Sequence, residues 1–170
     1  MMRGLLLLWL CCSLSAGAQS LQDLEGQPHT VADLLAPQKT QALVLVVWCS
    51  HCGSCRQMEK DLEKYAQEAG PEVRVFAVTP HPADTPQRVR AFLKEKESGL
   101  PVLRDPNQTL VSGLKVDRTT TALVYDKSAQ LRYIGPFQED QVGEVVEAVS
   151  SGREVEVVSR PLKGCPIPRY

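Results

Sequence analysis

The sequence is poor in aromatic residues and contains no block of basic residues. Phe, Trp and Tyr make up 5% of its 170 residues, and 19 Lys and Arg nearly balance 20 Asp and Glu. Proteins that bind nucleic acids or anionic membrane surfaces usually carry basic patches. We therefore expect neither kind of partner. The sequence also has no internal repeat, low-complexity segment or long linker, which predicts a single folded domain.

The N-terminus carries an apolar run that is too short to span a membrane. Arg3 precedes the apolar residues 4–12, and the small residues Ala16-Gly17-Ala18 follow. This order is typical of a secretory signal peptide. We expect residues 1–18 to be that peptide, 19–152 to be the folded domain and 153–170 to be an extended tail containing Cys165. A retained membrane anchor is the alternative, although a span needs about 20 apolar residues. The protein is thus expected to be exported, to the periplasm, with no stable membrane span after cleavage.

Cleavage would leave four of the six cysteines, and three of these lie within seven residues. Cys49, Cys52 and Cys55 form two overlapping C-x-x-C pairs. A C-x-x-C at the junction of a strand and a helix is typical of a thioredoxin-like redox site. The N-terminus of a helix stabilises a thiolate at the first cysteine. The second cysteine, about one turn later, can then displace a mixed disulfide.

Strands and helices alternate along the predicted domain. The stretch 42–48 (ALVLVVW) is apolar throughout, as expected for a strand buried on both faces. Apolar residues then recur at helical spacing from 55 to 69, before Gly70-Pro71. Further strands are expected at 73–78, 101–103, 121–125 and 131–134, and further helices at 85–93, 108–114 and 142–152. This order predicts an α/β three-layer sandwich.

The chain resembles the thioredoxin superfamily, specifically the redoxin branch of exported bacterial thiol–disulfide oxidoreductases. Residues 47–56 (VWCSHCGSCR) align without gaps on the family pattern F-W-A-x-W-C-x-x-C-[RK]. Residues 102–105 (VLRD) match the family's PVLxD, and 116–126 (VDRTTTALVYD) match V-x-x-x-P-x-x-F-L-x-D. The resemblance implies a thioredoxin-like fold with a central mixed sheet, followed here by the extended tail. It also implies disulfide exchange with protein thiols and an upstream electron donor or acceptor, without a cofactor.

The alignment favours Cys52 and Cys55 as the catalytic pair. Trp48 matches the tryptophan at the end of the family's strand, and Cys55, Met58 and Leu62 then share one helix face. The alternative reads 48–52 (WCSHC) as the motif, makes Cys49 and Cys52 the pair, and moves the helix by three residues. A peroxiredoxin would need P-x-x-x-T-x-x-C, which precedes neither Cys49 nor Cys52.

Several residues near the predicted site depart from the family pattern. Thr120 replaces the family's cis-proline, and because a cis bond before a non-proline residue is costly, we expect a trans loop. His51 replaces a tryptophan; as imidazolium it would lower the pKa of Cys52, whereas an exposed neutral histidine would not. Cys165 has no counterpart in ordinary thioredoxins. It is either a free thiol on a loose tail or lies on a tail that folds back beside the active-site loop, where it could bond with Cys49 or act as a further resolving thiol.

A metal-binding protein of the same fold is the alternative function. Cys49, Cys52, Cys55 and His51, with Cys165, are suitable soft ligands for copper(I) or zinc. The related copper chaperones have a histidine in a V-D-H-S motif, where this chain has Arg118. Disulfide exchange is therefore the preferred hypothesis and metal delivery the second.

Overall fold

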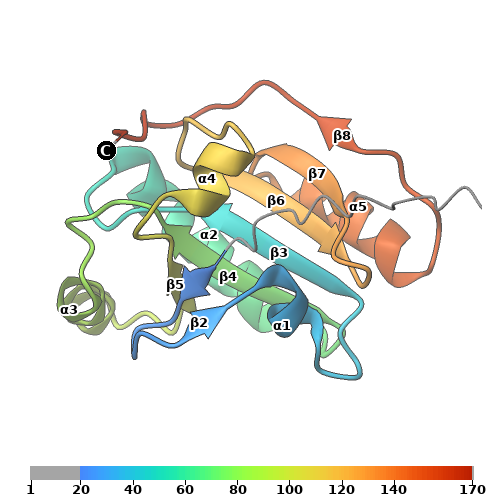
Figure 1. The fold of residues 1–170 in the computed structure, drawn as a ribbon, viewed down its shortest axis with the longest axis horizontal. Coiled ribbons are helices and arrows are strands. Elements are labelled where there is room, and N and C mark those ends of the chain that lie inside the picture. The colour runs from blue at the N-terminus through green and yellow to red at the C-terminus, as the bar shows by residue number, and fades with distance from the viewer. Residues whose placement is uncertain (1–19, 170) are drawn as a thin grey trace, which may run out of the picture.

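A mixed sheet forms the centre of the protein (Figure 1). The computed structural model describes residues 20–169, so the predicted signal peptide lies outside the described residues. The strands follow the order β2-β1-β5-β4-β3-β6-β7-β8. Strands β3, β4 and β5 are parallel, and β6 runs antiparallel to β3. The strands are β1 (Leu21–Gln22), β2 (Pro28–His29), β3 (Ala42–Val47), β4 (Val73–Thr79), β5 (Val102–Arg104), β6 (Thr121–Asp126), β7 (Leu131–Pro136) and β8 (Val158–Ser159).

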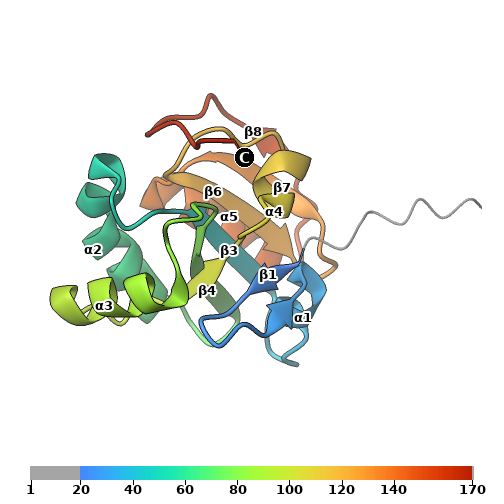
Figure 2. The ribbon, with the colours of Figure 1, turned by 60° about the vertical axis from the view of Figure 1, so that its left-hand side comes forward.

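Helices cover both faces of the sheet, which gives the three layers that the sequence predicts. They are α1 (Val31–Leu35), α2 (Gly53–Glu68), α3 (Pro86–Lys96), α4 (Thr109–Gly113) and α5 (Glu139–Ser150). Val44 and Val46 of β3 face the core formed with α2, α3 and α5. Leu43 and Leu45 face the second core, formed with α1 and α4. The two views show α1 and α4 on one side of the sheet and α2 and α3 on the other (Figures 1 and 2). Burial on both faces explains why β3 is apolar throughout.

The start of α2 places the cysteine segment, and the start of α3 is capped by a side chain. Helix α2 begins directly after Cys52, its N-cap residue, and its buried face includes Cys55, Met58 and Leu62. Glu59 is also buried on this helix, which the spacing of apolar residues did not predict. Helix α3 begins at Pro86 after Thr85, whose side chain accepts a hydrogen bond from the Arg88 amide at 3.3 Å.

The tail beyond Gly152 is extended, as expected, and it packs against the domain. It adds β8 alongside β7 in parallel and then runs along the edge of the sheet toward α4 (Figure 1). Near its end, the Ile167 amide donates to the Asp117 carbonyl at 2.9 Å, and the Ile167 side chain is buried in the core under α4. Within residues 20–169, no helix is both long and apolar enough to cross a membrane.

Candidate active site

Three thiols cluster where β3 ends and α2 begins. The loop after Val47 carries Cys49 and Cys52, which are buried, and the first turn of α2 carries the fully buried Cys55. The three sulfur atoms all lie within 4.8 Å of one another. The parallel strands place this loop at the carboxyl end of the sheet, where α/β proteins commonly bind their ligands.

Cys52 is the thiol that the site stabilises as a thiolate. Its Sγ lies 3.3 Å from Thr119 Oγ1 and 3.7 Å from Ser54 Oγ. Burial opposes ionisation, but hydrogen bonds from the Cys165 and Thr119 side chains, together with the Cys55 amide and Ser54, lower the pKa of Cys52 to about 6. At neutral pH Cys52 is therefore largely thiolate, the nucleophilic form of cysteine.

Cys55 has the opposite character. The hydrogen bond between its thiol and Cys49, together with burial, raises the pKa of Cys55 well above its usual range. The same hydrogen bond lowers the pKa of Cys49, whose amide also donates to Cys55 Sγ at 3.4 Å. Cys55 is thus a protonated thiol at rest, and Cys49 is its direct partner.

The tail brings the fourth cysteine to the same place. Cys165 Sγ lies 3.2 Å from Ser54 Oγ, which is itself 3.7 Å from Cys52 Sγ, and the Cys165 thiol contributes to the lowered pKa of Cys52. Of the two alternatives for this residue, the structure therefore has the folded-back tail. Its neighbour is Cys52, whereas Cys49 contacts Cys55. All four described cysteines are free thiols.

A buried carboxylate beside the loop was missed by the sequence analysis. Asp84 is fully buried and accepts hydrogen bonds from Ser50 Oγ at 2.5 Å, the Ser50 amide at 3.1 Å and Thr79 Oγ1 at 2.7 Å. His51 Nδ1 lies 3.6 Å from Asp84 Oδ1, and the His51 ring stands edge-on to His81 with the ring centroids 4.2 Å apart. Asp84 follows β4 in a loop, where no motif marks it.

The loop opposite Cys52 contains Thr119 and Thr120. Every peptide bond within residues 20–169 is trans, as expected for the bond before Thr120, which adopts φ 57°. The Thr120 hydroxyl donates to the Lys163 carbonyl at 3.2 Å, so it holds the tail. The side chain that reaches Cys52 belongs to Thr119, which the sequence analysis did not single out. Trp48 is fully buried and packs edge-on against Phe92, with ring centroids 5.3 Å apart.

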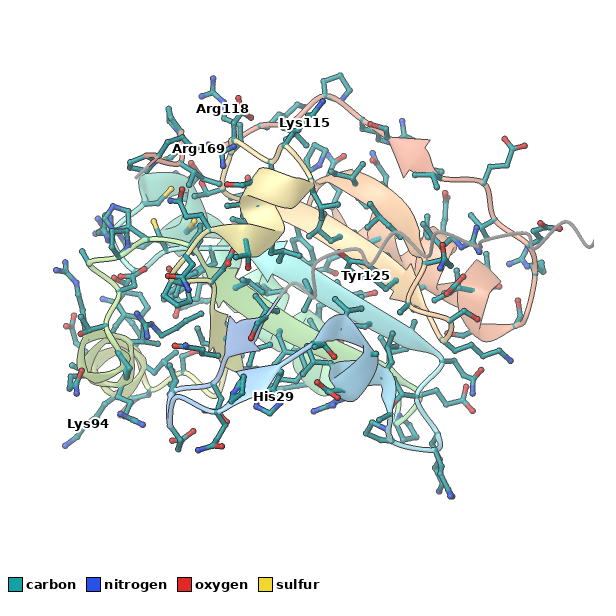
Figure 3. All side chains as sticks on the ribbon, in the orientation of Figure 1. His29, Lys94, Lys115, Arg118, Tyr125 and Arg169 are labelled. Carbon is teal, nitrogen blue, oxygen red and sulfur yellow. The ribbon has the colours of Figure 1, made fainter. Side chains whose placement is uncertain are left out.

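A cavity of about 250 Å³ opens beside Cys52. The cysteine loop forms one wall, Pro80 and His81 form another, and residues 165–168 of the tail close it. Figure 3 labels Arg118 and Arg169, which lie at this end of the molecule. Because the tail forms a wall of the cavity, a substrate that reaches Cys52 through it must contact the tail.

Solved structures share this architecture. A hypothetical protein from Sinorhizobium meliloti is 25% identical over 89% of this chain and 91% of its own, with a TM-score of 0.74. A conserved protein from Geobacillus kaustophilus is 20% identical over 91% of this chain and 90% of its own, with a TM-score of 0.76. The exposed lipoprotein thioredoxin of Streptococcus pneumoniae is 24% identical over 75% of this chain and 96% of its own, with a TM-score of 0.62. A comparison with curated protein sequences finds no match.

Fold and site together define the class of protein, a thioredoxin-like thiol–disulfide oxidoreductase. A reactive thiol at the start of α2, with a second thiol one turn later, is the arrangement that this chemistry requires. The chain belongs to the AhpC/TSA family, whose model matches residues 15–134. The resemblance to the redoxin branch of the thioredoxin superfamily is thereby confirmed.

Proposed function

We propose that the protein is an exported thiol–disulfide oxidoreductase in which Cys52 is the nucleophile and Cys55 resolves the mixed disulfide. The observation that carries the proposal is the opposite character of the two thiols. The pKa of Cys52 is lowered to about 6, whereas that of Cys55 is raised. Export, to the periplasm, rests on the predicted signal peptide at residues 1–18.

The geometry supports the following exchange. The Cys52 thiolate attacks one sulfur of a substrate disulfide, and the other substrate sulfur leaves as a thiolate. Cys55 then attacks the Cys52 sulfur, forming the Cys52–Cys55 disulfide and releasing the second substrate thiol. Cys55 must first lose its proton, and Cys49, which shares a hydrogen bond with the Cys55 thiol, is placed to accept it. An upstream electron donor or acceptor resets the pair. Protein thiols or disulfides are the proposed substrates, without a cofactor.

Cysteine variants test the assignment. Cys52→Ser should lose both exchange activity and the ability to form a mixed disulfide with a model disulfide, oxidised glutathione. Cys55→Ser should form the adduct and hold it longer than the wild type, because its main resolving thiol is missing. Intact-protein mass spectrometry after rapid acid quenching measures both. If Cys52→Ser traps substrate and Cys55→Ser stays active, the catalytic pair is Cys49 and Cys52.

Soft-metal binding is the second candidate function, and one observation favours it. The sulfur atoms of Cys49, Cys52 and Cys55 lie within 4.8 Å of one another, a spacing that allows all three to bind one ion, and thiolates suit copper(I) or zinc. His51 groups instead with Cys49 and Asp84. If exchange is the main activity, mature protein purified anaerobically with reductant should carry little copper or zinc. Stoichiometric metal that survives dialysis and is lost in Cys52→Ser would make metal binding the primary function.

A further inference from the structure

The tail pairs with the loop beside Cys52 as an extended segment. The Thr119 amide donates to the Cys165 carbonyl at 2.9 Å, and the Cys165 amide donates to Thr119 Oγ1 at 3.0 Å. Arg118 and Pro166 form an antiparallel bridge next to this contact. The tail therefore binds the loop as an added strand would, and it does so at the residue that contacts Cys52.

The pairing directs one thiol to the nucleophile. Ser54 Oγ lies 3.2 Å from the Cys165 sulfur and 3.7 Å from the Cys52 sulfur, and Thr119 contacts both residues, so the two thiols lie side by side. On the inner side, the Cys55 sulfur lies within 4.8 Å of the Cys52 and Cys49 sulfurs and accepts a hydrogen bond from the Cys49 amide at 3.4 Å. Cys52 thus lies between two candidate resolving thiols, Cys55 in the core and Cys165 on the tail.

Contacts beyond Cys165 keep its thiol in place. Ile167 is buried, the Gln108 side-chain Nε2 donates to the Pro168 carbonyl at 2.6 Å, and the Arg169 side chain donates to the Val116 carbonyl at 2.9 Å. A thiol held next to its target reacts far faster than the same thiol free in solution, because its positional entropy is already lost.

We propose that Cys165 is a second resolving cysteine, which forms an intrachain disulfide with Cys52 in competition with Cys55. The proposal rests on the proposed function, because it takes Cys52 as the nucleophile. It assigns a role to a tail residue that lies outside the C-x-x-C pair.

The step is a thiol–disulfide exchange that needs no further oxidant. After Cys52 has formed a mixed disulfide with substrate, the Cys165 thiol loses its proton to water and its sulfur attacks the Cys52 sulfur. The bond between Cys52 and the substrate breaks, the substrate leaves as a thiolate, and the Cys52–Cys165 disulfide forms. The substrate disulfide gains two electrons in total, and Cys52 and Cys165 lose two. Cys55 can then displace Cys165, which moves the disulfide inward.

A pair of variants isolates the tail thiol. Cys49→Ser/Cys55→Ser keeps only Cys52 and Cys165 in the described structure, and Cys49→Ser/Cys55→Ser/Cys165→Ser keeps Cys52 alone. With oxidised glutathione as the probe, the first should lose its adduct, end without free thiols and yield a cross-linked peptide joining Cys52 to Cys165. The second should keep the adduct at least about tenfold longer, since no positioned thiol remains. Equal adduct lifetimes in the two variants would overturn the proposal.

A second experiment leaves every cysteine in place, so it does not depend on how the core tolerates serine. Gly164 has φ 107°, and a Cβ there would overlap the Thr119 carbonyl oxygen, so Gly164→Ala should displace the tail. Gly152→Ala is the matched control, because Gly152 also has positive φ (73°) but a Cβ there meets nothing within 4 Å. Under partial oxidation, Gly164→Ala should give several-fold less Cys52–Cys165 cross-linked peptide than Gly152→Ala. Equal yields, or none in the wild type, would refute the role of Cys165.

The outcomes separate this proposal from the one on which it rests. If Cys52→Ser still forms adducts, the nucleophile has been misassigned and the proposed function fails. If Cys52 forms adducts, but Cys165→Ser alters neither their lifetime nor the cross-link pattern, the exchange function stands and only the second resolving role fails.

Discussion

The hydroxyl of Thr119 is predicted to set the pH at which Cys52 becomes reactive. Thr119 Oγ1 accepts from the Cys165 amide, and its one proton has two acceptors, Cys52 Sγ at 3.3 Å and the Cys165 carbonyl at 3.4 Å. The thiolate is the charged and therefore the stronger acceptor of the two. Thr119→Val keeps the shape of the side chain and removes this donor. The structure places the wild-type pKa of Cys52 at about 6.

The size of the effect follows from the strength of one hydrogen bond to a charged group. Such a bond contributes about 1.5 kcal/mol or more, and one pKa unit corresponds to about 1.4 kcal/mol. Cys52 keeps its contact with Ser54, and the tail keeps the hydrogen bond from the Thr119 amide to the Cys165 carbonyl, so we take the lower value and expect the pKa to rise by about one unit. Because a higher pKa leaves less thiolate below it, Cys52 should react about fivefold more slowly at pH 6, and at about the wild-type rate near pH 9.

The assay is the pH dependence of Cys52 alkylation by iodoacetamide, resolved by peptide mass spectrometry. Thr119→Ser, which restores a hydroxyl, should return the midpoint toward the wild-type value. Thr120→Val is the matched control, because its hydroxyl contacts the Lys163 carbonyl instead of the thiolate. An unchanged midpoint in Thr119→Val, or an equal shift in Thr120→Val, would refute the reasoning.

Three further predictions concern stability and metal content. Asp84→Ala should lower the free energy of unfolding, measured in urea, by about 3 kcal/mol, because three buried donors lose their acceptor. Ser50→Ala removes one of these donors and should lower it by about 1 kcal/mol. Equal losses in the two variants would contradict this account. Ile167→Ala should cost about 2–3 kcal/mol and speed proteolysis of the tail, whereas Val157→Ala, at a side chain that is 57% exposed, should change neither. Reduced mature protein should contain far less than one copper or zinc per chain by elemental analysis, since the thiols serve exchange.

Local patterns in the sequence were sufficient for the elements that position the site. The apolar run of β3 required burial on both faces, and the spacing of Cys55, Met58 and Leu62 fixed which face of α2 turns inward. The ends of helices are also marked locally, as by Thr85 and Pro86 at the start of α3. These features depend on neighbours a few residues apart, so the sequence by itself determined the fold class and the position of the C-x-x-C segment at the start of a helix.

The environment of Cys52 depends on residues that are distant in the chain. Thr119 is 67 residues from Cys52, Cys165 is 111 residues from Ser54, and Asp84 is 34 residues from Ser50. The family pattern placed the loop of Thr119 and Thr120 near the site, but the two residues are indistinguishable by type, and no pattern marks Asp84. The antiparallel β3–β6 pairing brings Thr119 to the end of β3, the parallel β3–β4 pairing brings Asp84 there, and the return of the tail brings Cys165. The tertiary structure therefore decided which hydroxyl faces the nucleophile and which thiol lies next to it, because those contacts depend on how separate strands pack together.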